Sequence, residues 1–352
     1  MYKLNMYIYD PHKRNEFFSL LLGYLSKEKM EELIIDKSWQ GGYSIQIMSD
    51  NLKILRKIEG FFKLKVKPRS LTQYEVEKQK ILSRKLSFME ETEPIMDVFS
   101  EGESIVSEVN REQIEKKYKF DYNSIISSLR ARTNYMLKSS GLWAEKTEAE
   151  RYYYCLGLAY IIADTYPEGA LYGSFSYRSN FEYYKKQLEL LNISEDKRKK
   201  YFGYLNNSSD HEVEAENLFV YNFLDSKDYL NDYIFESFIE YINYCYSIFS
   251  DGFKENEKFY GELYTASTFF ERVSNPSEFH NMAYTDEKII KLYNERQFII
   301  HRYMLAQLYS LFPLLGIKNI KKQKVLGKVT ELLEERNGVN WLEKLRGKFN
   351  GV

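Results

Sequence analysis

The chain has 352 residues, of which 44% are hydrophobic and 16% aromatic, and only 6 are proline. Such a composition excludes a disordered protein, and the length predicts two or three domains or one elaborated α+β unit around a large core. The 50 basic and 51 acidic residues nearly cancel, so no overall field draws the protein to nucleic acid or to an anionic membrane.

The two cysteines and the N-terminus indicate the compartment. Cys155 and Cys245 stand among aromatic residues and share no motif, which argues against a disulfide scaffold or a zinc site and favours a reducing environment. The first ten residues alternate like a strand and lack the apolar core of a signal peptide, and no apolar run approaches the roughly 18 residues that span a bilayer. We therefore expect a cytoplasmic protein without membrane insertion.

The first seventy residues predict a small sheet. Apolar and polar residues alternate at 4–8, 45–47 and 64–66, which is typical of three strands. Helical periodicity at 13–36 and 50–60 separates these strands. The β-α-β-α-β order favours helices packed on one face of the sheet, so we expect the α+β class.

Residues 67–103 are charged and only weakly periodic, and the sequence leaves a hairpin, a β-ribbon and a mobile segment as open alternatives. Basic residues gather around the first half of this segment and could bind an acidic peptide; among them are Lys65, Lys67, Arg69, Lys78 and Arg84. The alternative is an ordinary solvated face. On the first interpretation, 65–93 is the segment where we expect the peptide to bind.

Helices dominate the chain after residue 103. Their periodicity and end signals predict helices at 121–137, 147–165, 180–191, 224–249, 286–312 and 321–336. The aromatic stripes on these helices are typical of a core, and no internal repeat indicates a solenoid. We therefore divide the chain into an α+β portion (1–103) and a mainly helical portion (104–352) that form one integrated catalytic unit.

The stretch 166–184, with the sequence YPEGALYGSFSYRSNFEYY, is the strongest candidate for a site. Ser179 and Glu182 have the spacing of a capping box, which predicts a helix that begins at Ser179 or Asn180 after a glycine-containing loop. The polar residues of that loop would stand around the helix's positive end: Tyr172, Ser174, Ser176, Tyr177 and Arg178. Converging donors suit a carbonyl, carboxylate or phosphate oxygen. The alternative is a helix-capping loop without function.

Common catalytic signatures are missing from the chain. No G-x-G-x-x-G follows a strand, and no phosphate-binding loop, H-E-x-x-H or C-x-x-C motif exists, so neither a nucleotide cofactor nor catalytic zinc has support. His301 lies on a strongly apolar helical segment, where a titratable ring needs a partner. It is either a proton donor or a hydrogen-bonded histidine of the core.

Three segments carry a resemblance to a known family. The opening KLNMYIYDPHKRNEFFSLLLGYL with GGYSIQI, the central YGSFSYRSNFEYY and the closing IIHRYMLAQLYSLFPLLGIK together resemble the C-terminal elimination-type domain of lantibiotic dehydratases. They also resemble its stand-alone relatives, the thiopeptide-type bacteriocin biosynthesis proteins. These relatives include the pyridine synthases, whose Ser-Tyr/Phe-Arg-Ser-His segment is similar to residues 176–180 here.

The resemblance implies a formal [4+2] cyclisation of two dehydroalanines in a leader-bearing, azole-containing peptide. Loss of water and of the leader then gives a pyridine, without a cofactor. It implies that Ser176 and Tyr177 contact the reacting amide and that Arg178 and Ser179 orient carbonyls. The proton would be moved by Tyr172, Tyr177, Glu168 or His301. The resemblance also implies that the basic residues of 65–93 recognise the leader. The implied partners are the precursor peptide and other enzymes of the pathway, and a homodimer stays open.

Two departures from the family pattern leave alternatives. Elimination domains carry histidine and arginines in the second strand, where Ser44 and Gln46 stand here, so glutamate elimination is disfavoured. Asn180 replaces the final histidine and cannot act as an acid or base near neutral pH. The alternatives are an eliminating or amide-modifying enzyme on a leader-bearing peptide, and a leader-binding or assembly protein without catalysis.

Overall fold

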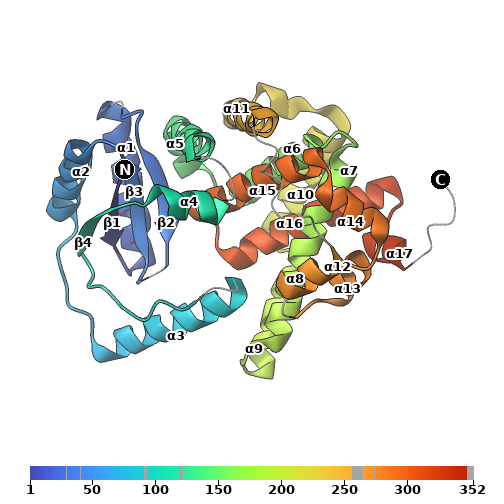
Figure 1. Ribbon diagram of the computed structural model, residues 1–352, viewed down its shortest axis with the longest axis horizontal. Helices are drawn as coiled ribbons and strands as arrows, with labels where there is room; N and C mark the ends of the chain where they lie inside the picture. The colour runs from blue at the N-terminus through green and yellow to red at the C-terminus, as the bar shows by residue number, and fades with distance from the viewer. Residues whose placement is uncertain are drawn as a thin grey trace. The chain divides into compact units, whose positions relative to one another are not determined.

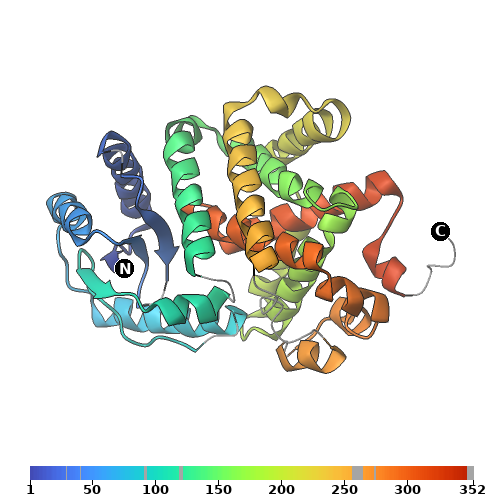
Figure 2. The same cartoon turned by 45° about the horizontal axis from the view of Figure 1, so that its top comes forward.

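The computed structural model describes residues 1–28, 30–39, 41–90, 93–118, 122–255, 265–272 and 275–346 (Figures 1 and 2). The chain forms two compact units. Unit 1 comprises Met1–Ala144 and Pro313–Gly316, and unit 2 comprises Glu145–Phe312 and Ile317–Val352. A small sheet followed by helices confirms the α+β class, and residues 104–144 belong to the same unit as the sheet.

Unit 1 contains a four-stranded antiparallel sheet of order β2-β3-β1-β4. Its strands are β1 (Tyr2–Tyr7), β2 (Ile34–Ser38), β3 (Ser44–Ser49) and β4 (Ser104–Glu108). Its helices are α1 (Pro11–Glu28), α2 (Leu52–Lys65), α3 (Gln73–Glu90), α4 (Arg111–Tyr118) and α5 (Tyr122–Glu145). In the register of β1, Leu4 pairs with Ile47 of β3 and Val106 of β4.

Helices α1 and α2 lie on one side of the sheet (Figure 1), and α2 packs against β1 and β3. Ile58 and Phe62 are four residues apart on the buried face of α2. The predicted strand at 64–66 is wrong, because α2 continues to Lys65. Leu64 lies on the last turn of this helix, where it is 83% exposed. The predicted helix at 13–36 is too long, since α1 ends at Glu28 and Ile34 begins β2.

Residues 67–103 form neither a hairpin nor a β-ribbon. They contain the 18-residue helix α3, and residues 93–100 have no regular structure. A reciprocal capping interaction begins α3: Thr72 Oγ1 accepts the Glu75 backbone N–H at 3.2 Å, and Glu75 Oε2 accepts the Thr72 backbone N–H at 2.8 Å. The T-x-x-E spacing was therefore a signal that our sequence analysis missed.

Helix α5 covers the β2 edge of the sheet. Thr133 Oγ1 accepts the Ile35 backbone N–H at 3.0 Å, and the fully buried Arg132 donates to the Ile35 carbonyl at 3.3 Å. These bonds satisfy edge groups that would otherwise be open to another strand. The expected start of α5, Asp121, lies outside the described residues, and the helix continues past its predicted end at 137 to Glu145.

Residues 313–316 complete unit 1 from far along the chain. The Leu315 carbonyl accepts Trp143 Nε1–H at 3.1 Å, and Lys37 Nζ lies 3.5 Å from the Leu314 carbonyl. Burial, with the nearby Arg14 charge, lowers the pKa of Lys37 to about 7. A short returning segment thus satisfies polar groups of α5 and β2.

Unit 2 is built around α6 (Glu148–Asp164), where every residue from Tyr152 to Ala163 is buried. Its other helices are α7 (Ala170–Gly173), α8 (Phe175–Leu190), α9 (Glu195–Asn206), α10 (Asp210–Phe219), η1 (Val220–Ser226), η2 (Asp228–Asn231), α11 (Tyr233–Glu255), α12 (Ala266–Arg272), α13 (Glu278–Ala283), α14 (Glu287–Asn294), α15 (Arg296–Leu314), α16 (Asn319–Asn337) and α17 (Trp341–Leu345). A helix that is apolar all round must be surrounded, and α10, α11 and α16 pack against α6.

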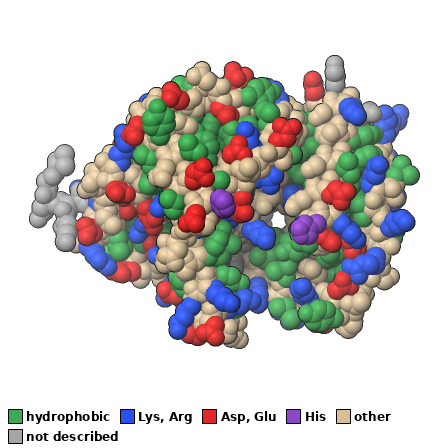
Figure 3. Space-filling model, turned by 180° about the vertical axis from the view of Figure 1, so that it is seen from behind, with side chains coloured by type: hydrophobic (Ala, Val, Ile, Leu, Met, Phe, Trp, Pro, Cys, Tyr) green, Lys and Arg blue, Asp and Glu red, His purple; other side chains and the backbone are tan. Residues whose placement is uncertain are grey.

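The predicted helices at 147–165 and 321–336 match α6 and α16 closely, and Thr147 with Glu150 forms the capping box of α6. The predicted helix at 224–249 is divided among η1, η2 and α11, and that at 286–312 is divided into α14 and α15 at Glu295. Within the described ranges no helix is long and apolar enough to cross a membrane. Acidic and basic side chains are interspersed on the face shown in Figure 3.

Candidate functional site

The expected loop at 166–184 is mostly helix. Helix α8 begins at Phe175 directly after the short α7, so Ser179 and Asn180 lie inside α8 and the predicted helix start there is wrong. The S-x-x-E spacing is also the i, i+3 spacing within any helix, and Glu182 pairs with Arg178 at 3.2 Å. The proposed N-terminal donors at Ser179 therefore do not exist.

This correction changes which side chains can act together. Successive residues of an α-helix point about 100° apart, so residues 176–180 cannot converge on one atom. They divide instead among four faces of α8. Three of these faces are directed at α6, at α16 and at α13, and the other carries polar side chains that have no partner among the described residues. Each face has a different chemical character.

Tyr177 lies on the face toward α6. Its fully buried hydroxyl donates to the Ala159 carbonyl at 2.7 Å, and burial raises its pKa well above the ordinary value. A tyrosine held in this way neither gives up a proton near neutral pH nor reaches a bound molecule. Tyr177 therefore fixes α8 against α6.

Arg178 lies on the face toward α16. It pairs with Glu182 at 3.2 Å and with Glu334 at 3.7 Å, while Arg178 Nε and Glu334 Oε1 have no hydrogen-bond partner in the part of the chain that the structure describes. Burial raises the pKa of Glu334, and the Arg178 charge opposes that shift. The guanidinium is thus largely compensated by carboxylates but keeps one free donor.

Ser176, Asn180 and Gln187 share the third face, at helical spacings of four and seven residues. Ser176 Oγ, Asn180 Oδ1 and Gln187 Nε2 are buried and have no hydrogen-bond partner among the described residues. Buried polar atoms in native proteins are nearly always paired, so such a row is unusual for a purely structural helix. One hydroxyl and two amides can both donate to and accept from a peptide group.

Ser179 lies on the fourth face, beside α13. Its Oγ is 3.0 Å from His280 Nε2, and His280 Nδ1 is 2.7 Å from Ser277 Oγ. His280 is 2% exposed, and burial lowers its pKa to about 4. Our sequence analysis did not select His280, because nothing in the chain connects it with a serine 101 residues away.

His301 is a core histidine and not a free proton donor. Its Nε2 lies 3.0 Å from the Gly173 carbonyl and must donate to it, while the buried Nδ1 has no partner within the described ranges. Burial lowers its pKa to about 4, so the ring is neutral at pH 7 and its one N–H is already engaged. It ties α15 to the end of α7.

The remaining predicted residues surround α7 without forming a common site. Tyr172 Oη accepts from Lys344 Nζ at 3.3 Å, and Ser174 Oγ donates to the Leu171 carbonyl at 2.7 Å. Glu168 is exposed in the turn before α7. The structure therefore places Ser176 and Asn180 together on α8 and leaves Tyr172, Ser174 and Glu168 outside that face.

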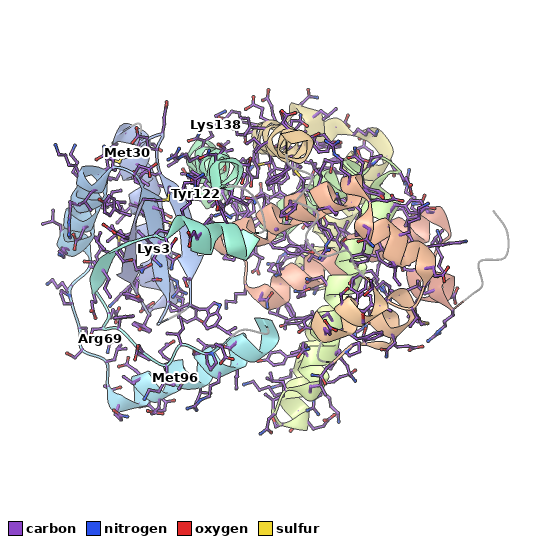
Figure 4. The ribbon with its side chains drawn as sticks, in the orientation of Figure 1. Lys3, Met30, Arg69, Met96, Tyr122 and Lys138 are labelled. Carbon is purple, nitrogen blue, oxygen red and sulfur yellow. The ribbon has the colours of Figure 1, made fainter. Side chains whose placement is uncertain are left out.

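Two of the predicted leader-binding residues line a groove of unit 1. The groove has a volume of about 430 Å³ and includes Arg69 and Lys78, whereas Lys65, Lys67 and Arg84 are not among its lining residues. Its other walls come from residues 9–13 at the start of α1 and from Leu71, Glu75, Gln79 and Glu101. Arg69 is labelled in Figure 4, near the start of α3.

The charges of this groove are partly compensated. Arg69 binds Glu75 through two parallel bonds of 2.9 and 2.8 Å and also binds Glu101 at 2.7 Å. The Arg69 bonds, followed by the Thr72 backbone N–H, lower the pKa of Glu75 to about 2. Lys78, whose side chain has no ion pair within the described residues, is therefore a better candidate than Arg69 for binding an acidic group.

Two solved structures share this fold over essentially the whole chain. The pyridine synthase TbtD from thiomuracin biosynthesis aligns with a TM-score of 0.57, covering 96% of this chain and 98% of its own, at 10% identity. TsrL aligns with a TM-score of 0.56, covering 100% and 99%, at 12% identity. At these identities the likeness establishes the fold. No family model and no curated protein matches the sequence.

Proposed function

We propose that this protein is a thiopeptide-type cyclase that joins two dehydroalanines of a leader-bearing, azole-containing peptide in a formal [4+2] reaction. Loss of water and of the leader as its amide then gives a pyridine. The observation that carries the proposal is the full-length likeness to the fold of a pyridine synthase. The unpaired polar atoms on α8, within the segment that resembles the pyridine synthases, support it further.

The α8 face suits the first demand of such a reaction, which is to hold one peptide in a reactive geometry. Holding the two reacting ends of a flexible chain in the correct orientation can lower the activation barrier by about 7–11 kcal/mol. In our proposal Ser176 donates to a carbonyl oxygen of the substrate, and Asn180 Oδ1 accepts the N–H of the reacting amide. Arg178 contributes its free Nε–H, while Tyr177 keeps the helix in place.

The groove of unit 1 suits the leader. An extended peptide offers backbone groups to Tyr9 and Gln79, and an acidic side chain would pair with Lys78. The compensated Arg69 holds the start of α3 to Glu101 and so shapes the wall. Of the segment 65–93, in which we expected the leader to bind, this proposal keeps only the residues that line the groove, such as Arg69 and Lys78.

Mass spectrometry tests the proposal directly. A synthetic leader-linked azole peptide with two dehydroalanines is incubated with the purified protein and no added cofactor. We expect release of an intact leader amide together with a core lighter by that leader and one water. Unchanged substrate that co-purifies with the protein would replace the proposal with the leader-binding alternative, and a change without ring formation would favour the eliminating or amide-modifying enzyme.

Substitutions on α8 provide the matched control. Ser176→Ala and Asn180→Ala remove atoms without protein partners, so the fold should keep its stability while product formation falls. Ser174→Ala, which removes a hydroxyl bonded to the Leu171 carbonyl, should leave product formation near the wild-type level. Equal activity of all three variants would contradict the assignment of this face.

A further inference from the structure

A chain of three side chains crosses from α8 to α13. Ser179 Oγ lies within hydrogen-bond distance of His280 Nε2, at 3.0 Å, and Ser277 Oγ within hydrogen-bond distance of His280 Nδ1, at 2.7 Å. The imidazole is almost fully buried, whereas Ser179 at one end of the chain is partly exposed. The arrangement therefore connects a partly exposed serine with a titratable ring that is shielded from solvent.

In the resting protein, without substrate, the surroundings keep the ring neutral. Its aromatic neighbours are Tyr284, Phe279 and Tyr183, with ring centroids at 5.2, 5.6 and 6.1 Å. Burial alone accounts for the lowered pKa, with no contribution from a charged side chain. A neutral imidazole has one donor and one acceptor nitrogen, so the tautomer decides the direction of both hydrogen bonds.

The position of Ser277 favours one tautomer. Ser277 is the N-cap of α13, and its Oγ accepts the backbone N–H of His280 at 3.4 Å. A hydroxyl oxygen can accept a second bond, and Nδ1–H is well placed to donate it. The lone pair of Nε2 then faces Ser179, whose hydroxyl donates to it.

We propose that Ser179, His280 and Ser277 form a proton relay on the face of α8 that adjoins the row of Ser176 and Asn180, an inference that rests on the proposed function; Ser176 and Ser179 are three residues apart and therefore neighbours on the helix surface. Ser179 Oγ takes a proton from a substrate N–H or O–H while its own proton passes to His280 Nε2, so the substrate becomes anionic and the ring becomes imidazolium. The reverse transfer returns one proton to a departing oxygen or nitrogen. Ser179 is the catalytic residue in this scheme, and His280 and Ser277 act through it.

Nuclear magnetic resonance of the resting protein tests the relay without any substrate. The protein is labelled with ¹⁵N-histidine, and His280→Gln assigns the ring signals among the four histidines. We expect the signature of a neutral ring protonated at Nδ1, with Nε2 as acceptor. A ring protonated at Nε2 would overturn the proposal, because Ser179 could not then pass its proton to His280.

Kinetics give the second measurement. Ser179→Ala and His280→Gln should each lower kcat by about 10²–10⁴-fold with little change in KM, and His280→Gln should reduce the solvent isotope effect. His211→Gln, at an exposed position of α10, is the control and should retain wild-type values. Wild-type kcat in His280→Gln would overturn the relay. If the wild-type protein makes no product, the proposed function fails. The His280 tautomer measured by nuclear magnetic resonance then still tests whether Ser179 can pass its proton to the ring.

Discussion

Gly173 brings the end of α7 unusually close to α6. A Cβ at this position would lie 2.0 Å from the Ala163 carbonyl oxygen, and real Cβ atoms essentially never approach within 3.0 Å. In Gly173→Ala the end of α7 must therefore shift by about 1 Å, because the obstacle is backbone. The shift also pulls the Gly173 carbonyl away from His301 Nε2.

The cost follows from these two effects. Overpacking a close contact costs about 1–3 kcal/mol, and loss of the buried hydrogen bond adds about 0.5–1.5 kcal/mol. We therefore expect Gly173→Ala to lower the free energy of unfolding by about 2–4 kcal/mol. At about 2–4 °C per kcal/mol, the melting temperature should fall by roughly 4–16 °C.

Thermal unfolding followed by circular dichroism measures this effect. Gly203→Ala is the matched control, because Gly203 lies inside α9 and the nearest atom to its added Cβ is 3.9 Å away. That variant should be more stable than the wild type by up to about 1 kcal/mol. A Gly173→Ala protein as stable as the wild type would refute the reasoning.

Three further predictions concern other contacts. Tyr177→Phe should cost about 1 kcal/mol of stability, measured by urea unfolding, and retain most product formation, because its hydroxyl bonds only to backbone; complete loss of product would return Tyr177 to the catalytic group. Burial alone would raise the pKa of Glu212, but hydrogen bonds from Lys324 and Ser209 outweigh burial and lower the pKa. The ionised Glu212 therefore stabilises the folded protein above about pH 4.3, and this stabilisation is lost as the pH falls through the lowered pKa. Lys324→Met should therefore cost about 3–5 kcal/mol at pH 7 and weaken this pH dependence in pH-resolved unfolding; an unchanged acid limb would contradict the pairing. Lys78→Glu should weaken leader binding measured by fluorescence anisotropy, whereas Arg84→Glu, away from the groove on the same helix, should not; equal effects would indicate only a general charge effect.

Local periodicity was sufficient for some elements of the fold and not for others. The strands around Leu4 and Ile47 were predicted because their apolar residues alternate, and the helix α6 was predicted because its length and end signals are those of a helix. The short strands β2 and β4 were missed. Each of them has only five residues and is stabilised by pairing with another strand of the sheet. In addition, β4 has no buried residue, so its sequence does not show which of its faces points toward a core.

The site was predicted in the right segment but with the wrong local structure. Glycines and hydroxyls at 169–176 suggested a loop, whereas packing of Phe175 against Phe279 and Trp341 favours helix from that residue onward. The contact of Ser179 with His280 could not be predicted, because it arises only when α13 packs on α8. Spacing within one segment carries no information about such a contact.

The return of residues 313–316 to unit 1 has a consequence for synthesis of the chain. Met1–Ala144 leaves the ribosome long before Leu314 and Leu315, whose carbonyls accept from Lys37 and Trp143. Roughly 170 residues must be added in between, which takes about 10–30 s at ordinary translation rates. During that interval the nascent sheet unit lacks these two carbonyl acceptors for Lys37 and Trp143, so this part of its stabilisation comes only after residues 313–316 have been made.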